Sequence, residues 1–224
     1  MMKRCTILAA LVAAAPAAAQ QSFAAPEGCE ATLTVQHKGC LVVNVWQQCP
    51  SDDPGDQWIA LLGQGGLFSV QRVDREFQWV EAFKITGDEE LITPADDPAS
   101  LDELFASQID TWDFTLDTEE GRERHVGYDL LTGETVMIDG EELLRTEFQG
   151  RTLDAEGNEI EASVGRQYVS EEHRMFFLGE TWQPDTPDRV VDLSPVEFIY
   201  PDEPGFFTAE PIYECNQIDT GYRP

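Results

Sequence analysis

The chain has 224 residues and carries 43 Asp and Glu against 14 Lys and Arg, which gives a formal charge of −29 at pH 7 and a pI near 4.1. This excess of carboxylates excludes nucleic-acid binding, because displacing counterions from phosphates needs clustered positive charge. It also argues against docking on anionic lipid headgroups. The hydrophobic fraction of 42% is too high for a disordered acidic tail, so we expect a folded core.

The first residues have the pattern of a secretory signal. Lys3 and Arg4 precede a short apolar run over residues 7–15, and Ala17-Ala18-Ala19 supplies the small residues of a cleavage site. We therefore predict a cleaved signal peptide over residues 1–19, a single β-rich domain over 20–224 and a periplasmic or secreted location. The alternative is a retained N-terminal anchor, although the apolar run is shorter than a spanning helix needs. After cleavage we expect no integral membrane segment.

Cysteine usage agrees with export, because four cysteines follow the predicted cleavage site: Cys29, Cys40, Cys49 and Cys215. Residues 30–48 read as a hairpin with Cys29 and Cys49 at its open end. This favours the pairing Cys29–Cys49 with Cys40–Cys215, and the other two connectivities stay open. A zinc site is the alternative reading, but the spacings are not C-x-x-C.

The first half of the chain predicts strands and one helix. After the hairpin, with strands at 32–36 and 41–46, further strands are expected at 58–62, 68–73 and 77–83. A helix of about ten residues begins at Ser100, which forms a capping box with Glu103. A helix this short is unstable alone, so its apolar face must dock on the sheet.

The stretch between Ala99 and Gln183 contains no proline, as expected of an uninterrupted sheet. Apolar residues alternate with polar ones in the period of a strand, and a more continuously apolar run suggests one fully buried strand. Turns are expected at Thr132-Gly133, at Asp139-Gly140, which is a type I′ hairpin signal, and at residues 154–158. The predicted strands cover 112–116, 126–130, 136–138, 160–164 and the buried run 175–178.

These elements define a fold class. Short turns between successive strands leave no room for crossover helices, so we expect a mainly β protein with an antiparallel meander. The meander forms a curved sheet or open barrel, with one short helix and a C-terminal proline-rich strap over residues 194–215. A closed barrel and a sandwich remain alternatives.

Acidic residues occur in two patterns that are candidates for a functional site. Adjacent acidic pairs occur at the frequency that chance predicts and fall largely at turns, so we interpret them as a solvated surface. The segment Asp52-Asp53-Pro54-Gly55-Asp56 gathers oxygen ligands around a glycine turn, which makes Asp52, Asp53 and Asp56 a weak calcium alternative. The segment lacks the regular ligand spacing and distal glutamate of an EF-hand.

Catalytic signatures are absent from the sequence. There is no G-x-S-x-G, H-E-x-x-H or S-x-x-K motif, and nothing selects one of the scattered histidines. The tripeptide Asp219-Thr220-Gly221 lies too close to the terminus for an aspartic protease loop, and Gly63-Gln64-Gly65-Gly66 reads as a hairpin turn rather than a dinucleotide loop. We therefore predict no catalytic residues, no cofactor and no resident metal.

Aromatic residues spread over many strands are the remaining clue. The simplest interpretation is that they form a packed core. The more specific hypothesis is an apolar ligand face formed by Trp79, Trp112, Phe114, Tyr128 and Phe176. The leading hypothesis is a monomeric, non-enzymatic module that binds a hydrophobic small molecule, lipid or protein segment. The alternatives are a structural or interaction protein that meets an envelope protein, and a hydrolase whose site is not visible in the sequence.

Overall fold

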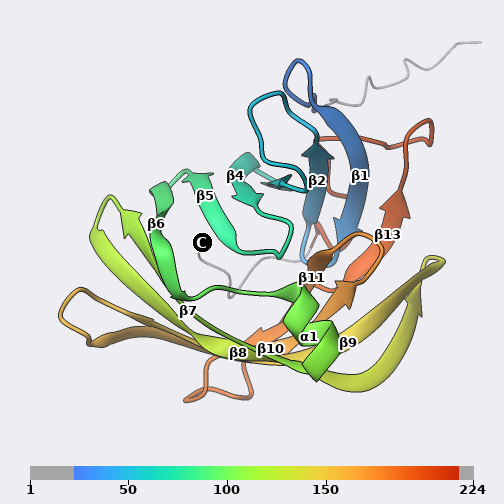
Figure 1. The fold of residues 1–224 in the computed structure, drawn as a ribbon. Coiled ribbons are helices and arrows are strands. Elements are labelled where there is room, and N and C mark those ends of the chain that lie inside the picture. Colours follow the sequence, from blue (N-terminus) through green and yellow to red (C-terminus); the bar gives the residue numbers. More distant parts are fainter. Residues whose placement is uncertain (1–22, 217–224) are drawn as a thin grey trace, which may run out of the picture.

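The computed structural model describes residues 23–216, which form a mainly β protein around one thirteen-stranded antiparallel sheet (Figure 1). The strands run in chain order across the sheet from β12 back to β1, and β13 pairs with the free edge of β1. The sheet is open. The predicted antiparallel meander and its single short helix are therefore confirmed. The strands and the helix are β1 (Glu30–His37), β2 (Leu41–Gln47), β3 (Gln57–Gly63), β4 (Gly66–Val73), β5 (Trp79–Lys84), β6 (Gly87–Asp97), α1 (Leu101–Ser107), β7 (Ile109–Thr118), β8 (Gly121–Ile138), β9 (Glu141–Leu153), β10 (Glu159–Ser170), β11 (Met175–Trp182), β12 (Val191–Asp192) and β13 (Pro195–Ile199).

Tight turns set the register of the meander. Asp139 and Gly140 both have positive φ, 49° and 92°, and the flanking residues Ile138 and Glu141 pair directly. This is the geometry that a two-residue type I′ hairpin requires, as the sequence predicts. Gly63 and Gly66 likewise face each other across the hairpin between β3 and β4, which explains these glycines without a nucleotide.

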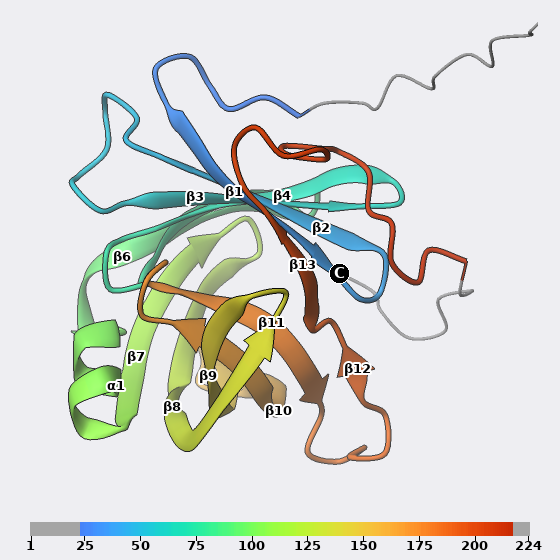
Figure 2. The ribbon, with the colours of Figure 1, turned by 90° about the vertical axis from the view of Figure 1, so that its right-hand side faces the viewer.

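The sheet curls so that its first strands lie over its later ones. In Figure 2, β1 to β4 form an upper layer and β7 to β11 a lower layer. The main hydrophobic core fills the space between them, with Leu33, Val35 and Val43 from the first strands packed with Leu143 and Phe177 from the later ones. Burial of this apolar surface is the principal force that holds the curl.

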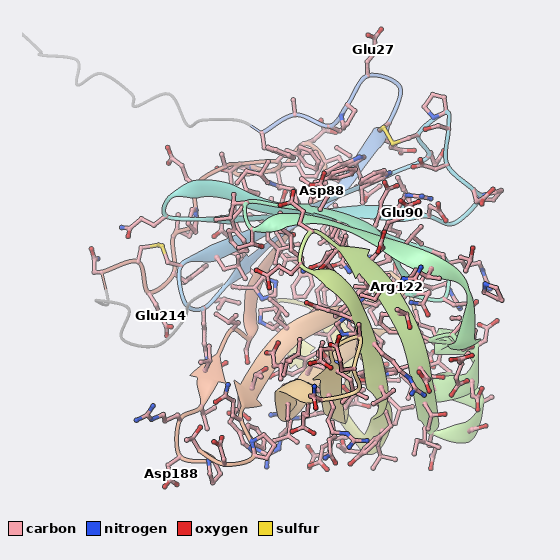
Figure 3. All side chains as sticks on the ribbon, turned by 90° about the vertical axis from the view of Figure 1, so that its left-hand side faces the viewer. Glu27, Asp88, Glu90, Arg122, Asp188 and Glu214 are labelled. Atoms are coloured by element: carbon pink, nitrogen blue, oxygen red, sulfur yellow. A yellow bond between two sulfur atoms is a disulfide. The ribbon has the colours of Figure 1, made fainter. Side chains whose placement is uncertain are left out.

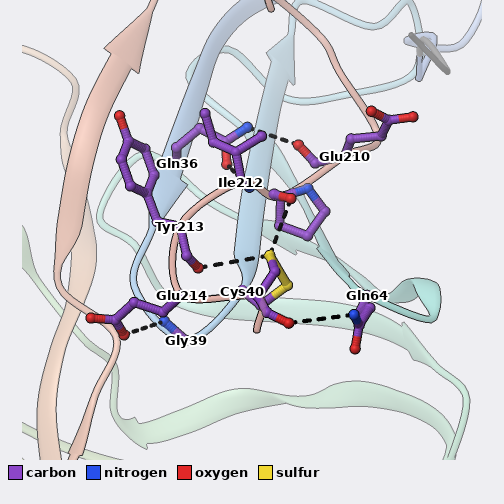
Figure 4. Close-up of a disulfide and its surroundings, with 10 residues drawn as sticks. Gln36, Gly39, Cys40, Gln64, Glu210, Ile212, Tyr213 and Glu214 are labelled. Atoms are coloured by element: carbon purple, nitrogen blue, oxygen red, sulfur yellow. Dashed lines mark hydrogen bonds between the residues drawn. A yellow bond between two sulfur atoms is a disulfide. The ribbon is translucent and has the colours of Figure 1, made fainter. Parts of the chain in front are cut away.

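The C-terminal strap covers the other face of β1 and β2, so these strands are buried on both sides. Buried polar side chains of the sheet hold the strap. Thr34 Oγ1 accepts a hydrogen bond from Phe207 N (2.8 Å), and Asn44 Nδ2 donates to Thr208 O (2.8 Å). Gln36 bonds to Glu210 and Ile212 (Figure 4). Phe207 of the strap packs against the sheet and is only 6% exposed.

Two disulfides reinforce these contacts. Cys29 is bonded to Cys49 at the open end of the first hairpin, and Cys40 is bonded to Cys215 at the end of the strap (Figure 4). This is the connectivity that the hairpin geometry favours. Two disulfides are compatible with a protein outside the cytoplasm. Within residues 23–216, no helix is long and apolar enough to cross a membrane. The predicted signal peptide and Asp219-Thr220-Gly221 lie outside the described residues.

Four elements differ from what the sequence predicts. The turn expected at Thr132-Gly133 is an irregularity within one long strand, β8, because the pairing with β9 continues on both sides of it. Strand β6 was not expected, since its sequence is rich in acidic residues and contains Pro94. In the run Met175-Phe176-Phe177-Leu178, burial alternates and Leu178 is exposed. Residues 195–199, expected within the strap, form β13.

Helix α1 spans seven residues, and its cap differs from the expected capping box in one bond. The Ser100 side chain accepts from Glu103 N at 3.1 Å, as predicted. The backbone N–H of Ser100, however, donates to Asp110 Oδ2 at 3.0 Å rather than to Glu103. Leu101 and Leu104 are fully buried against Val169 of β10, so the helix docks on the sheet. The cap therefore ties the helix to β7.

Charged side chains are distributed around the whole molecule. The exposed carboxylates labelled in Figure 3 come from separate elements: Glu27 before β1, Asp88 and Glu90 on β6, Asp188 before β12 and Glu214 in the strap. The negative charge thus coats the surface rather than gathering in one patch.

Candidate functional site

A cavity of about 450 Å³ lies between α1 and the strands β5 to β11. Its floor is one face of β7, β8, β9 and β10, where alternate residues of each strand point the same way. Six aromatic rings contribute to its wall: Phe77, Trp79, Trp112, Phe114, Phe148 and Phe176. Its size and its aromatic rings are typical of a small-molecule site, and charged side chains line it as well.

Strand glycines make room for the rings in the floor. Gly127 and Gly150 pair across β8 and β9 beneath the indole of Trp112, and Gly165 lies beneath the ring of Phe148. A Cβ atom at Gly127 would lie 2.5 Å from Cζ2 of Trp112, and one at Gly165 would lie 2.6 Å from Cε1 of Phe148. Both approaches are too close for a side chain. The glycines therefore allow the rings to lie against the backbone of the sheet, as interior strand glycines do where another group approaches closely.

The rings contact one another in an ordered group. Phe114 has its centroid 5.7 Å from that of Trp79 and 5.8 Å from that of Trp112, and it stacks on the imidazole of His125 at 5.2 Å. Phe77 and Phe176 form a separate edge-to-face pair at 5.3 Å, close to α1. These distances and angles are the favourable ones for aromatic pairs, so the cavity wall is preorganised.

Two aspartates lie in this apolar wall. Asp110 on β7 and Asp129 on β8 are register partners and are only 4% and 8% exposed. Asp129 accepts hydrogen bonds from Trp112 Nε1 (3.0 Å) and Gln167 Nε2 (2.9 Å). Asp110 Oδ2 accepts from Ser100 N, but its Oδ1 is buried with no hydrogen-bond partner. Burial raises the pKa of Asp110 to about 7 and that of Asp129 to about 6.

His125 also faces the cavity. Its Nδ1 lies 3.3 Å from Thr152 Oγ1, whereas its Nε2 is buried without a partner. Burial lowers the pKa of His125 to about 4, so the ring is neutral at pH 7. Within the described part of the chain, no histidine ring is hydrogen-bonded to a serine hydroxyl, which is what a serine hydrolase would need.

Four of the five residues expected on the ligand face line the cavity: Trp79, Trp112, Phe114 and Phe176. Tyr128 does not, because it alternates with Gly127 and Asp129 and therefore points to the other face of β8. Sequence reasoning missed Asp110, Asp129 and Gln167. Asp110 lies two residues before Trp112 on β7, and Phe114 lies two residues after it. Because residues two apart on a strand share a face, this spacing places Asp110 on the aromatic face of the strand.

The calcium alternative gains no support from the geometry. Asp56 Oδ2 pairs with Arg72 at 2.7 Å, and Asp52 Oδ2 accepts from Trp58 Nε1 at 2.7 Å. Over residues 23–216, no group of three or more His, Cys, Asp or Glu side chains is arranged to hold a metal ion.

Comparison of the chain with protein-family models, with curated proteins and with solved structures gives no match.

Proposed function

We propose that this protein is a non-enzymatic, monomeric binding module that takes up a hydrophobic small molecule in the cavity between α1 and the sheet. The observation that carries the proposal is the aromatic wall around about 450 Å³ of space. Binding sites for small molecules typically have volumes of this order, apolar linings and a few polar groups that orient the ligand. A cavity this small suits a compact molecule better than a protein segment.

We further propose that the protein works in the periplasm or after secretion. The supporting observations are the signal-like pattern of residues 1–19 and the two disulfides, which persist in an oxidising compartment.

Calorimetric titration of the native protein with neutral and anionic apolar probes tests the binding proposal. The probes are indole, octanol, naphthylethanol and decanoate. We expect saturable binding of at least one neutral probe. Replacing Ser163, which lines the cavity on β10, by Phe should weaken that binding roughly tenfold, because the new ring occupies ligand space.

The matched control is Ala162→Phe, which adds the same ring to the other face of the same strand. It should leave the affinity within about twofold, close to the error of such a measurement. The proposal would be contradicted if the native protein bound none of the four probes. It would also be contradicted if Ser163→Phe left the affinity unchanged.

A further inference from the structure

The cavity carries more negative charge than its own cations neutralise. Arg174 pairs with Glu76 at 2.8 Å, and Lys84 pairs with Glu89. Asp110 and Asp129 differ from Glu76 and Glu89, because no ion pair within residues 23–216 involves either aspartate. The charged residues of the wall are the carboxylates Glu76, Glu89, Asp110, Glu123, Asp129 and Glu161 and the cations Lys84 and Arg151.

Asp110 and Asp129 lie side by side. As register partners on adjacent antiparallel strands, they have Cβ atoms about 5 Å apart on the same face of the sheet. Both are more than nine-tenths buried. A buried carboxylate without a cation is strongly unfavourable, and two neighbouring ones are more so, because the like charges repel. This arrangement leaves a strongly favourable position for one positive charge.

The hydrogen bonds define where that charge fits. Both oxygens of Asp129 already accept one bond each, from Trp112 and Gln167. Asp110 uses only Oδ2, so its buried Oδ1 is the free acceptor in the wall. Because this atom has almost no accessible surface, an N–H group in the cavity reaches it when the Asp110 carboxylate turns toward the cavity. The aromatic faces of Trp112 and its neighbours can further stabilise a cation placed over them.

Resting on the function proposed above, we infer that the ligand is a hydrophobic amine, whose protonated nitrogen binds between Asp110 and Asp129 while its apolar body packs on Trp112, Phe114 and Phe148. The ammonium donates to Oδ1 of Asp110. A metal ion is a poorer occupant, because the described residues bring too few ligands together. A carboxylate ligand, such as a fatty acid, is disfavoured by the two aspartates.

The test compares naphthylethylamine with naphthylethanol, which has the same apolar body and no charge. In calorimetry on the native protein at pH 7.5, above the pKa of Asp110, the amine should bind roughly tenfold more tightly than the alcohol or better, because its ammonium donates a charge-assisted hydrogen bond that the neutral hydroxyl cannot match. Asp110→Asn and Asp129→Asn should each remove most of this preference, which is measured as the ratio of the amine affinity to the alcohol affinity in the same variant.

The control variant is Asp117→Asn, which removes an exposed carboxylate from the same strand. It should leave the preference for the amine unchanged, which separates a local effect from attraction to a highly negative protein. Asn at position 110 can still accept from Ser100 N, and Asp129→Asn provides an independent answer if the first variant unfolds.

The outcomes separate the two proposals. If the alcohol binds and the amine binds no better, the inference of an amine ligand is overturned and the binding function stands. A preference for the amine that survives in both cavity variants would also overturn the inference. If neither molecule binds, the inference of an amine ligand is overturned. The proposed function fails as well only when indole, octanol and decanoate do not bind either.

The pH dependence gives a second check. Asp129 on β8, Glu103 on α1 and Asp97 on β6 are the charged groups that face Asp110, and Asp129 itself is contacted by the neutral donors Trp112 and Gln167. An ammonium binds the ionised carboxylates, so the affinity for the amine should rise as pH increases from about 5 to about 8. The affinity for the alcohol should not follow this rise; a parallel rise for both ligands would contradict the inference.

Discussion

The position of Trp112 in the cavity floor depends on the glycines beneath its ring. The indole of Trp112 lies against β8 and β9 because residues 127 and 150 are glycines. In Gly127→Ala, the added methyl would overlap Trp112 and approach the carbonyl oxygen of Gln149 still more closely. We expect a loss of about 2 kcal/mol in the free energy of unfolding, as for other overpacked sites. Urea denaturation measures it.

The matched control is Gly65→Ala, at a turn where a Cβ atom meets nothing within 4 Å. This variant should change the free energy of unfolding by less than about 0.5 kcal/mol. Equal losses in the two variants would contradict the close approach of Trp112 and the Gln149 carbonyl oxygen to Gly127.

Asp110 should make the protein less stable as pH rises. Its pKa is about 7 in the folded state against an ordinary value of 3.8, so the folded state binds the proton more tightly. Its contribution to stability is therefore full below pH 4 and is lost as pH rises to about 7. Asp110→Asn should remove this loss, so the difference in stability between variant and native protein should shift in favour of the variant across that interval.

The difference between the two proteins is the quantity to measure, because other groups act in the opposite direction. Burial lowers the pKa of both His37 and His125 from 6.5 to about 4, so these residues add stability as pH rises through the same interval. Urea denaturation at several pH values gives the comparison. A difference that is constant with pH would contradict a raised pKa at Asp110.

At the scale of the element, the two disulfides should contribute unequally. Cys40–Cys215 closes a separation of 175 residues and Cys29–Cys49 one of 20. The chain-entropy model gives a stabilisation of about 5 kcal/mol for the first and about 3 kcal/mol for the second. Replacing each pair by serines and measuring urea denaturation should show the larger loss for the pair that pins the strap. The reverse order would mean that the contacts of Thr34, Gln36 and Asn44 hold the strap without its covalent link.

The alternating pattern predicts most of the strands but not the face that each residue takes. Val126, Tyr128 and Leu130 look like the buried set of β8, yet the cavity receives Glu123, His125 and Asp129 from this strand. Periodicity shows which residues share a face and leaves open which face lines a cavity. The spacing on β7 places Asp110 on the face of Trp112 and Phe114. The aspartates were still missed, because the spacing does not show that this face is buried.

Strand β6 is an element that the sequence pattern does not predict. Its partners β5 and β7 supply the hydrogen bonds that its acidic sequence would not favour by itself. The N-terminal hairpin shows the opposite case, since its turn and cysteine positions were sufficient to favour the observed disulfides.

For the molecule as a whole, the net charge of −29 is a source of self-repulsion. We expect the free energy of unfolding to rise when NaCl is increased from about 0.02 M to about 0.5 M, because the Debye length falls and the surface carboxylates are screened from one another. Thermal or urea denaturation at constant pH measures the effect. A flat response would show that the charges are too far apart, or too well paired with arginines, to matter.

A crystal structure of the protein soaked with naphthylethylamine would show whether an amine binds in this cavity. We expect density between α1 and the sheet, with the naphthyl ring on Trp112 and the nitrogen within hydrogen-bond distance of Asp110 Oδ1. A structure in which the cavity stays closed to the ligand, or in which the ligand binds only on the outer surface, would contradict this expectation.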